Sequence, residues 1–211
     1  MTGAAQLQLD LSRDQTVLFA RYARLLQTWN EKINLTAITD PKEVAVKHFL
    51  DSLAPSAHLP KRGRLLDIGS GGGFPGIPLK IVRPHQPMVL IDAVRKKINF
   101  IKTVIRDLDL RLIEALHVRA EDYSKNHMPS AGFDVVVSRA LADVDLVIRL
   151  AMPLLNHGGR LVIYQGPQAM ETGDAEKHVR YGQIRLSRGF KSYRLPHTGD
   201  RRAIVVLDRC Q

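Results

Sequence analysis

The feature that most restricts the fold of this chain is a glycine-rich stretch that directly follows an apolar run. Residues 65–76 read LLDIGSGGGFPG, with glycines at positions 69, 71, 72, 73 and 76. Glycine adopts positive φ and lets a ligand approach the backbone closely. In open α/β sheets, ligands bind at the carboxyl ends of the strands, where such a turn lies. The stretch therefore predicts a cofactor-binding turn in an α/β fold; the alternative is a turn that serves only tight packing.

Beyond Gly63, short apolar runs alternate with helical stretches. We expect strands at 64–67, 88–92, 112–118, 134–138 and 160–164, with helices chiefly at 95–108 and 143–155. Such alternation is typical of βαβ units, which form a parallel sheet with right-handed crossovers. Near the end, runs 184–195 and 203–208 are joined only by a turn at 196–200. This pattern predicts an antiparallel hairpin that closes one edge of the sheet.

The first 60 residues have helical patterns instead. Leu18, Tyr22, Leu25 and Trp29 are spaced to share one helical face, and we expect Trp29 in the core. Residues 40–43 read Asp-Pro-Lys-Glu, which is typical of a capped helix start, and this helix should run to about residue 53. We therefore expect a helical extension at 1–60 and a cofactor-binding domain at 61–211.

The chain is strongly basic, and the excess charge is unevenly placed. Its 211 residues include 31 Lys and Arg against 21 Asp and Glu, a net charge of +10. Residues 1–60 carry six basic and six acidic side chains, so the whole excess lies in residues 61–211. A basic domain favours a polyanionic partner such as nucleic acid, because neutralised phosphates release counterions. Acidic lipid, or a merely solvated surface, is the alternative that charge alone leaves open.

Composition excludes several classes of protein. A lone cysteine, Cys210, excludes an intrachain disulfide framework and a Cys-rich zinc site, and we expect no metal. No apolar run approaches the ~20 residues that span a bilayer, and no secretory signal is visible at the start. We expect a soluble, cytoplasmic monomer with no membrane partner.

Two acidic residues bear on the identity of the cofactor. Asp67 stands just ahead of the glycines, and Asp92 ends the next strand, where a carboxylate can accept hydrogen bonds from two ribose hydroxyls. The glycines formally match a dinucleotide pattern, but that match begins several residues after the strand. A carboxylate ahead of the glycines favours the cationic end of S-adenosylmethionine over a pyrophosphate. After the third strand, Ala120 and Glu121 lie where an adenine edge is expected.

The end of the fourth strand, Ser138-Arg139-Ala140, limits the methyl-transfer chemistry. The Asn/Asp-Pro-Pro-aromatic turn typical of exocyclic amine methylation is missing, and Cys210 is too far along the chain to act as a nucleophile on pyrimidine C5. An acceptor that is already nucleophilic, such as guanine N7, needs no general base. We expect Arg139 to orient a phosphate or the cofactor, or else to pair with an acid such as Asp143.

Further polar residues are candidates for the substrate side. His48, Asp51 and Ser52 share a helical face that could line the cofactor pocket, although a solvated face is the favoured interpretation. Arg95 and Lys96 open a helix, where basic residues are unfavourable, so phosphate contact is one explanation for them, and a merely exposed surface is the default.

Four segments in this order give a specific resemblance. Residues 29–36, 48–53, 67–79 and 138–140 together resemble the RsmG (GidB) family of bacterial small-subunit rRNA methyltransferases. The likeness covers nearly the whole chain. It implies a class I S-adenosylmethionine-dependent, Rossmann-like α/β fold, with a mostly parallel seven-stranded sheet whose last strand is antiparallel. It also implies methylation of N7 of one guanine in the decoding-region loop of 16S rRNA.

The resemblance also assigns residues. It matches Gly69 and Phe74 to the family's cofactor-loop contacts, Ala120 and Glu121 to its adenosine-side pair, and Asp92 and Arg139 to its residues after the second and fourth strands. Together with Gly71 and Gly73 of the glycine turn, these are the residues that we expect to bind the cofactor. His48, Asp51 and Ser52 fall on a family segment and are substrate-side candidates, as are Arg95 and Lys96. One position departs from the family, because Gln165 stands where a lysine is common; Arg160, or Arg201 and Arg202, could supply the missing cation.

We therefore expect an rRNA guanine-N7 methyltransferase that uses S-adenosylmethionine and binds 16S rRNA or the small subunit on a basic face in its C-terminal part. A methyltransferase of the same fold acting on a small molecule is the first alternative. A non-catalytic RNA-binding protein with a vestigial cofactor turn is the second.

Overall fold

The computed structural model describes residues 2–126, 132–139, 143–166, 177–181 and 184–210. Strands and helices alternate through the middle of the chain, as the sequence pattern predicts. The strands are β1 (Leu65–Ile68), β2 (Met88–Asp92), β3 (Ile113–His117), β4 (Phe133–Arg139), β5 (Leu155–Gln165), β6 (Lys177–Tyr181), β7 (Ile184–Arg194) and β8 (Arg201–Arg209). The helices are α1 (Thr2–Gln6), α2 (Arg13–Ile33), α3 (Pro41–Glu43), η1 (Val44–Leu50), α4 (Asp51–Leu53), η2 (Ala54–His58), α5 (Gly76–Val82), α6 (Arg95–Asp107), α7 (Ala120–Asn126), α8 (Val144–Ala151) and η3 (Met152–Leu154).

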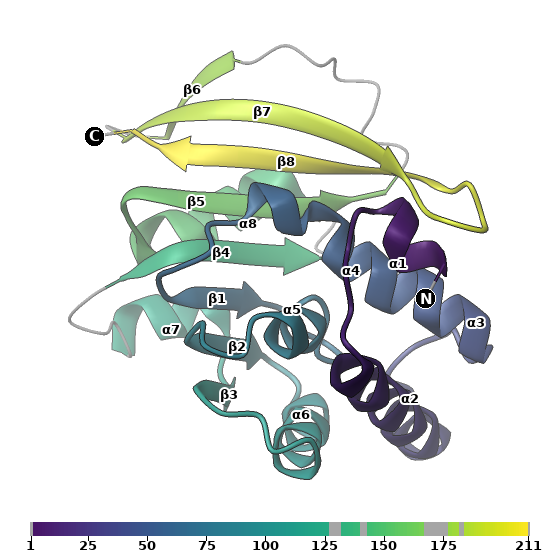
Figure 1. The fold of residues 1–211 in the computed structure, drawn as a ribbon. Helices are drawn as coiled ribbons and strands as arrows, with labels where there is room; N and C mark the ends of the chain where they lie inside the picture. Colours follow the sequence, from purple (N-terminus) through teal and green to yellow (C-terminus); the bar gives the residue numbers. More distant parts are fainter. Residues whose placement is uncertain (1, 127–131, 140–142, 167–176, 182–183, 211) are drawn as a thin grey trace.

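The strands form one mixed sheet in the order β3-β2-β1-β4-β5-β8-β7-β6 (Figure 1). Strands β1 to β5 pair in parallel, β8 is antiparallel to β5, and the β7–β8 hairpin is antiparallel as expected. The described sheet has eight strands instead of seven, because β6 pairs with the free side of β7. The sequence of β6, KHVRY, is too polar to predict a strand, so its backbone pairing decides its structure.

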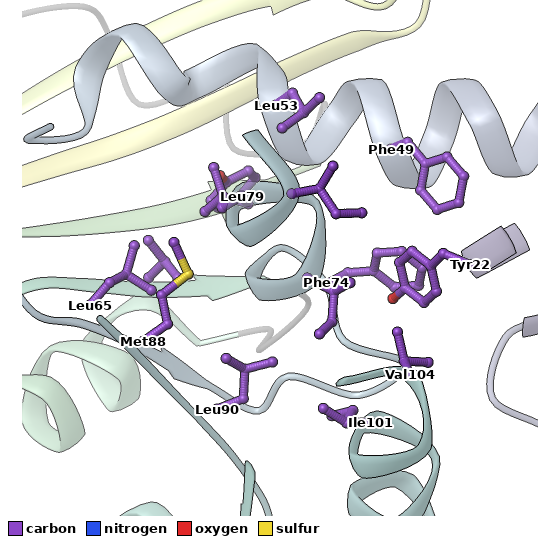
Figure 2. Packing of buried hydrophobic residues seen from close by; sticks show 14 of the residues in the cluster. Tyr22, Phe49, Leu53, Leu65, Phe74, Leu79, Met88, Leu90, Ile101 and Val104 are labelled. Carbon is purple, nitrogen blue, oxygen red and sulfur yellow. The ribbon is translucent and has the colours of Figure 1, made fainter. Parts of the chain in front are cut away.

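Both faces of the sheet are covered, as a parallel sheet requires. Successive residues of β1 point to opposite faces: Leu65 belongs to the hydrophobic cluster beneath α2, α5 and α6, whereas Leu66 belongs to the cluster beneath α8. Figure 2 shows the first cluster, to which Leu90 of β2 and Ile101 of α6 both contribute. Strand β2 is therefore buried throughout and β4 through most of its length, with Asp92 and Arg139 as their last residues.

Helix α2 packs on this first face of the sheet. Its buried side chains form a stripe that is shifted by one residue relative to the predicted helical face. Phe19, Tyr22 and Leu26 are its buried residues. Of the predicted set, Tyr22 is fully buried, while Leu18, Leu25 and Trp29 are partly buried at the rim. Trp29 nevertheless packs against the Phe100 ring of α6, with ring centroids 5.6 Å apart, so its assignment to the core is confirmed.

The second N-terminal helical stretch covers residues 41–53, as predicted, but its middle is not an α-helix. The Asp40 carboxylate caps the start by accepting from the backbone N–H groups of Lys42 and Glu43, each at 2.9 Å. The segment η1 is then a π-helix before α4 resumes α-helical geometry. Short π segments inside helices are frequent at functional sites, and this one contains His48.

These N-terminal helices lie at the edge of the sheet where the parallel strands end. The arrowheads of β1 and β4 point toward them in Figure 1. The apolar side chains of Tyr22, Phe49 and Phe74 meet there, as Figure 2 shows. No helix among the described residues is long and apolar enough to cross a membrane.

Candidate active site

The glycines of the turn between β1 and α5 have two roles: some allow close packing, and one leaves space for a ligand. Gly69, Gly71 and Gly73 have φ of 72°, 58° and 92°, which side-chain-bearing residues rarely adopt. A Cβ on Gly73 would lie 2.7 Å from the Tyr22 hydroxyl, and one on Gly76 would lie 2.7 Å from an Asp67 carboxylate oxygen. A Cβ on Gly71 would meet only a backbone oxygen, at 3.9 Å. Packing thus explains Gly73 and Gly76, whereas Gly71 faces space that a ligand can use.

Asp92, at the end of β2, holds this turn in place. One of its carboxylate oxygens accepts from the Gly71 backbone N–H at 2.9 Å, and the other accepts from the Val94 N–H at 2.8 Å. Each oxygen keeps a second lone pair, because a carboxylate oxygen can accept two hydrogen bonds. The side chain therefore fixes the glycine turn and can still accept from hydroxyl groups.

Asp67 lies beneath the turn and is completely buried. Its Oδ2 accepts from the Gly76 N–H at 2.9 Å, but its Oδ1 has no hydrogen-bond partner among the described residues. Burial raises the pKa of Asp67 to about 7, although the Gly76 hydrogen bond and the charge of Arg139 act in the opposite direction. An unpartnered buried carboxylate oxygen costs free energy unless a ligand supplies a donor. The residues present thus fit a ligand with a cationic, hydrogen-bond-donating end.

The remaining predicted cofactor residues lie along the same edge. Ala120 and Glu121 begin α7, directly after β3, where Ala120 is half-buried and Glu121 is exposed. Arg95 and Lys96 are exposed at the start of α6. Phe74 is different, because its side chain is buried in the core and leaves only its backbone to the turn.

Arg139, the last residue of β4, reaches from the sheet into the N-terminal helices. Its Nη2 donates to Nδ1 of His48 at 2.7 Å, and its Nη1 lies 3.2 Å from Ser52 Oγ and 3.5 Å from a carboxylate oxygen of Asp51. Its guanidinium carbon is 5.2 Å from the centre of the Phe74 ring, a cation–π distance. The structure thus brings four separately predicted residues, together with the aromatic residue of the glycine turn, into one cluster.

His48 in this cluster has a defined proton arrangement. Its Nδ1 must accept, because the arginine partner can only donate, so the ring proton lies on Nε2. Nε2 is 2.8 Å from the Thr36 hydroxyl, whose oxygen also accepts from the Ile38 N–H. Burial first, and the nearby positive charge of Arg139 second, lower the pKa of His48 to about 4. The imidazole is therefore neutral in the physiological range.

Asp51 joins the cluster to the far part of the sheet. The carboxylate oxygen facing Arg139 is also 3.7 Å from Nε of Arg202 on β8, and the other accepts from the Tyr193 hydroxyl of β7 at 2.7 Å. Burial raises the pKa of Asp51, while both arginines and the tyrosine hydrogen bond oppose that shift. The Tyr164 hydroxyl of β5 donates to the Ser52 carbonyl at 2.9 Å. Together with Arg139 of β4, these residues of β5, β7 and β8 mean that four strands hold the short helix α4.

The structure corrects two sequence-based interpretations of this region. His48, Asp51 and Ser52 do not form a solvated face, since all three are buried against the sheet. Asp143 does not pair with Arg139; it caps α8 and lies 4.0 Å from Arg149. The continuation at Ala140 lies outside the described residues.

Arg160 does not supply the positive charge of the lysine that the family commonly has at the position of Gln165. Arg160 pairs with Val135 near the amino end of the sheet, and its guanidinium is bound by the Asp208 carboxylate. Arg201 and Arg202 lie at the correct edge, because the adjacent Ala203 pairs with Gln165. Arg201 is exposed there, whereas Arg202 is half-buried beside Asp51.

Sequence reasoning missed Thr36, Tyr164 and Tyr193 as parts of the site. Thr36 stands within a segment that carried the family resemblance, which was a usable signal. Tyr164 ends the apolar run of β5, a pattern that cannot be told from core packing, and Tyr193 stands between Ser192 and Arg194, where no local pattern marks it. Among the described residues, no group of three or more His, Cys, Asp or Glu side chains could hold a metal ion.

Comparison with known proteins identifies the family. The profile described as rRNA small subunit methyltransferase G (GidB) matches residues 15–193. Ribosomal RNA small subunit methyltransferase G of Geobacter sp. (strain M21) is 46% identical over 98% of this chain and 94% of its own, and that of Geotalea uraniireducens is 42% identical over 99% and 94%. A Klebsiella pneumoniae structure described as a candidate O-methyltransferase superposes with a TM-score of 0.60 over 90% of each chain, at 12% identity. The chain therefore belongs to the rRNA small subunit methyltransferase G (GidB) family and has the class I methyltransferase fold.

Proposed function

We propose that this protein transfers a methyl group from S-adenosylmethionine to N7 of one guanine in 16S rRNA. The observation that carries the proposal is a buried Asp67 oxygen, beneath the glycine turn at the end of β1, that has no hydrogen-bond partner within the part of the chain that the structure describes. Such a carboxylate suits the cationic amino acid end of S-adenosylmethionine. The relatives that match nearly the full chain are named as methyltransferases of small-subunit rRNA, which supports RNA as the methyl acceptor.

The turn and the strand ends provide the groups for holding the cofactor. Gly69, Gly71 and Gly73 bring the backbone close to it, with Phe74 contributing through its main chain. Asp92 accepts from the ribose hydroxyls while it fixes Gly71. Ala120 and Glu121 lie at the end of the next strand, on the adenine side. When bound, S-adenosylmethionine supplies an electrophilic methyl group on a sulfonium.

Methyl transfer to N7 requires the protein to align the two reactants and does not require it to transfer a proton. Guanine N7 attacks with its own lone pair, and the electrons of the breaking carbon–sulfur bond remain on sulfur, so no proton is removed from N7. Alignment of a nucleophile and a leaving group can supply a large part of a rate enhancement. Arg139 is the residue placed for this role, since it stands at the end of β4 beside the glycine turn. A phosphate or cofactor contact suits it, because a hydrogen bond to N7 would block the nucleophile.

The RNA is bound by basic side chains at the same edge of the sheet. Arg95 and Lys96 are exposed at the start of α6, and Arg194 and Arg201 are exposed and paired across the β7–β8 hairpin. Arg201 stands beside the position of the absent lysine. The protein acts as a cytoplasmic monomer, in which residues 1–60 form an extension that completes the site of the 61–211 domain.

The deciding experiment incubates the protein with methyl-labelled S-adenosylmethionine and small-subunit RNA, then maps the modified nucleotide. Borohydride and aniline cleave RNA at N7-methylguanine, so one new cleavage site in 16S rRNA is expected. Naked 16S rRNA and assembled subunits are tested in parallel. Label in any other position or nucleotide, or no label in either RNA substrate, contradicts the proposal.

A further inference from the structure

We propose that His48 is a positioning residue for methyl transfer: as a neutral hydrogen-bond acceptor held by Thr36, it fixes the orientation of the Arg139 guanidinium. The inference rests on the proposed function, because it assigns Arg139 to the methyl-transfer site. It assigns His48 no proton transfer and no contact with the reacting atoms.

The contacts of Arg139 differ in their ability to fix a guanidinium. The Asp51 carboxylate is 3.5 Å away, and the His48 carbonyl and Ser52 hydroxyl are 3.4 and 3.2 Å away, all from the same Nη1. These three contacts converge on one nitrogen, so by themselves they do not fix the second arm of the guanidinium. The 2.7 Å hydrogen bond to His48 Nδ1 holds the second nitrogen, Nη2. Because it is short and lies on the other arm, it sets the plane of the guanidinium.

Two contacts hold the His48 ring, and a third holds its backbone. Thr36 takes the Nε2–H at 2.8 Å, and the Phe74 ring stacks on the imidazole with centroids 4.5 Å apart and planes 15° from parallel. The Ser52 hydroxyl donates to the His48 carbonyl at 2.5 Å within the π-to-α transition of the helix. The ring can therefore point Nδ1 in one direction, toward Arg139.

Phe74 connects this arrangement to the cofactor turn. Its ring contacts both the His48 imidazole and, at 5.2 Å, the Arg139 guanidinium, and its backbone belongs to the glycine turn. A movement of the turn therefore moves the ring against which both groups rest. The side chain of Arg139 is 15% exposed, and the hydrogen bonds described above use its two Nη atoms. A ligand that reaches the guanidinium therefore meets it in an orientation that His48 determines.

A positively charged His48 could not fix the orientation of the Arg139 guanidinium. A proton on Nδ1 would replace the acceptor with a donor and place two cations in contact. Arg139 from β4, Thr36 and Phe74 face the ring. Burial and the positive charge of Arg139 lower the pKa of His48 to about 4, and a hydrogen bond with the Lys47 backbone acts in the opposite direction. The ring thus stays an acceptor wherever the enzyme works.

The test separates hydrogen bonding from shape. His48→Gln keeps an acceptor and a donor, whereas His48→Leu keeps bulk and loses both. We expect kcat for RNA methylation to fall about 10- to 100-fold in His48→Leu, since small misplacements of aligned groups are costly. His48→Gln should recover most of that loss. S-adenosylmethionine affinity should change less than threefold in both variants, which a collapse of the whole site would not permit.

Two controls keep the outcome interpretable. His157→Gln makes the same exchange at an exposed histidine near the amino end of β5 and should leave kcat and Tm unchanged. If His48→Leu does not fold, Thr36→Val tests the same chain of hydrogen bonds with His48 in place. It should lower kcat several-fold at a nearly unchanged KM for RNA.

Imidazole nitrogen-15 spectra give a readout that does not depend on activity. We expect the neutral form with the proton on Nε2 to persist down to about pH 5. An imidazolium at pH 6, an unchanged kcat in His48→Leu, or equal losses in His48→Gln and His48→Leu at intact Tm would each overturn the inference. Failure of the proposed function is distinguishable, because the wild-type protein would then leave 16S rRNA unmethylated.

Discussion

One carboxylate oxygen of Asp51 lies between two arginines from different strands, 3.5 Å from Arg139 of β4 and 3.7 Å from Arg202 of β8. The second oxygen is held by Tyr193 of β7. A single buried acid therefore ties the end of the parallel part of the sheet to its antiparallel hairpin. Its loss should affect both the stability of the fold and the site.

Asp51→Asn should lower the free energy of unfolding by roughly 1–3 kcal/mol, because two arginines lose their shared counter-charge in a buried setting. Urea denaturation at pH 7 measures this. Asp107→Asn removes an exposed partner of Arg21 and should cost less than about 1 kcal/mol. Equal costs for the two variants would show that the Asp51 cluster adds nothing beyond a surface ion pair.

The affinity for S-adenosylmethionine should rise with pH up to about 7. Burial raises the pKa of Asp67 to about 7, so below that pH the carboxyl is protonated and a cationic ligand must displace the proton. Affinity is then lost by up to tenfold for each pH unit below 7. Calorimetry in buffers of different ionisation enthalpy will detect the released proton.

The matched variant is Asp67→Asn, which cannot ionise. Its affinity should be weaker at pH 8 and nearly independent of pH from 5.5 to 8. In the wild-type apoprotein the same raised pKa means that stability falls as pH rises from 3.8 toward 7, because the folded state binds this proton more tightly. A flat pH profile for wild-type binding would exclude Asp67 from contact with the ligand's cation.

Asp92→Ala should weaken S-adenosylmethionine binding by roughly 1–3 kcal/mol, the usual cost of a lost charge-assisted hydrogen bond. The variant also frees the Gly71 N–H, so the glycine turn should lose order. Calorimetric titration gives the affinity, and amide exchange at Gly71 reports the turn. Asp109→Ala, at an exposed acid paired with Arg111, is the control; unaltered binding in Asp92→Ala would remove this residue from the site.

Arg139→Ala should reduce turnover by at least tenfold while the fold remains intact. Arg139→Lys should not restore it, because an ammonium cannot reproduce the two-armed geometry that contacts both His48 and Asp51. Single-turnover rates with saturating cofactor isolate the methyl-transfer step. A lysine variant with a wild-type rate would mean that only the positive charge matters.

Replacing Arg201 with alanine should weaken RNA binding and make it less sensitive to salt. Each phosphate contact contributes about 0.7–0.9 to the slope of log K against log salt concentration. Arg62→Ala, an exposed arginine just before β1 at the opposite edge, should leave the slope unchanged. An RNA affinity independent of salt in the wild-type protein would favour a small-molecule acceptor.

The alternation of strands and helices and the position of the glycine turn could be predicted from the sequence because they depend on local patterns. Strand β2 was placed at its observed bounds, since turn residues flank an unbroken apolar run. Strand β6 was not predicted, because pairing with β7 and not its own composition decides its conformation.

The site could be predicted only in part. Gly71 follows the end of β1 and Asp92 ends β2. Because these two strands are parallel neighbours, the topology alone brings the two residues together. The contact of Arg139 with His48 joins residues 91 positions apart and depends on how a helical stretch docks on the sheet. No periodicity in a single sequence contains that information, and for the same reason the burial of Asp51 was misjudged.

The hydroxyl of Tyr22, on α2, donates to the Gly72 carbonyl at the tip of the cofactor turn. The turn is thus shaped partly by a residue that precedes the sheet by more than forty positions. This contact restricts how chimeras between such enzymes can be built, because helix α2 and the glycine turn must come from the same parent. A chimera that takes the sheet from one enzyme and the N-terminal helices from another would separate the glycine turn from the tyrosine that hydrogen-bonds to it.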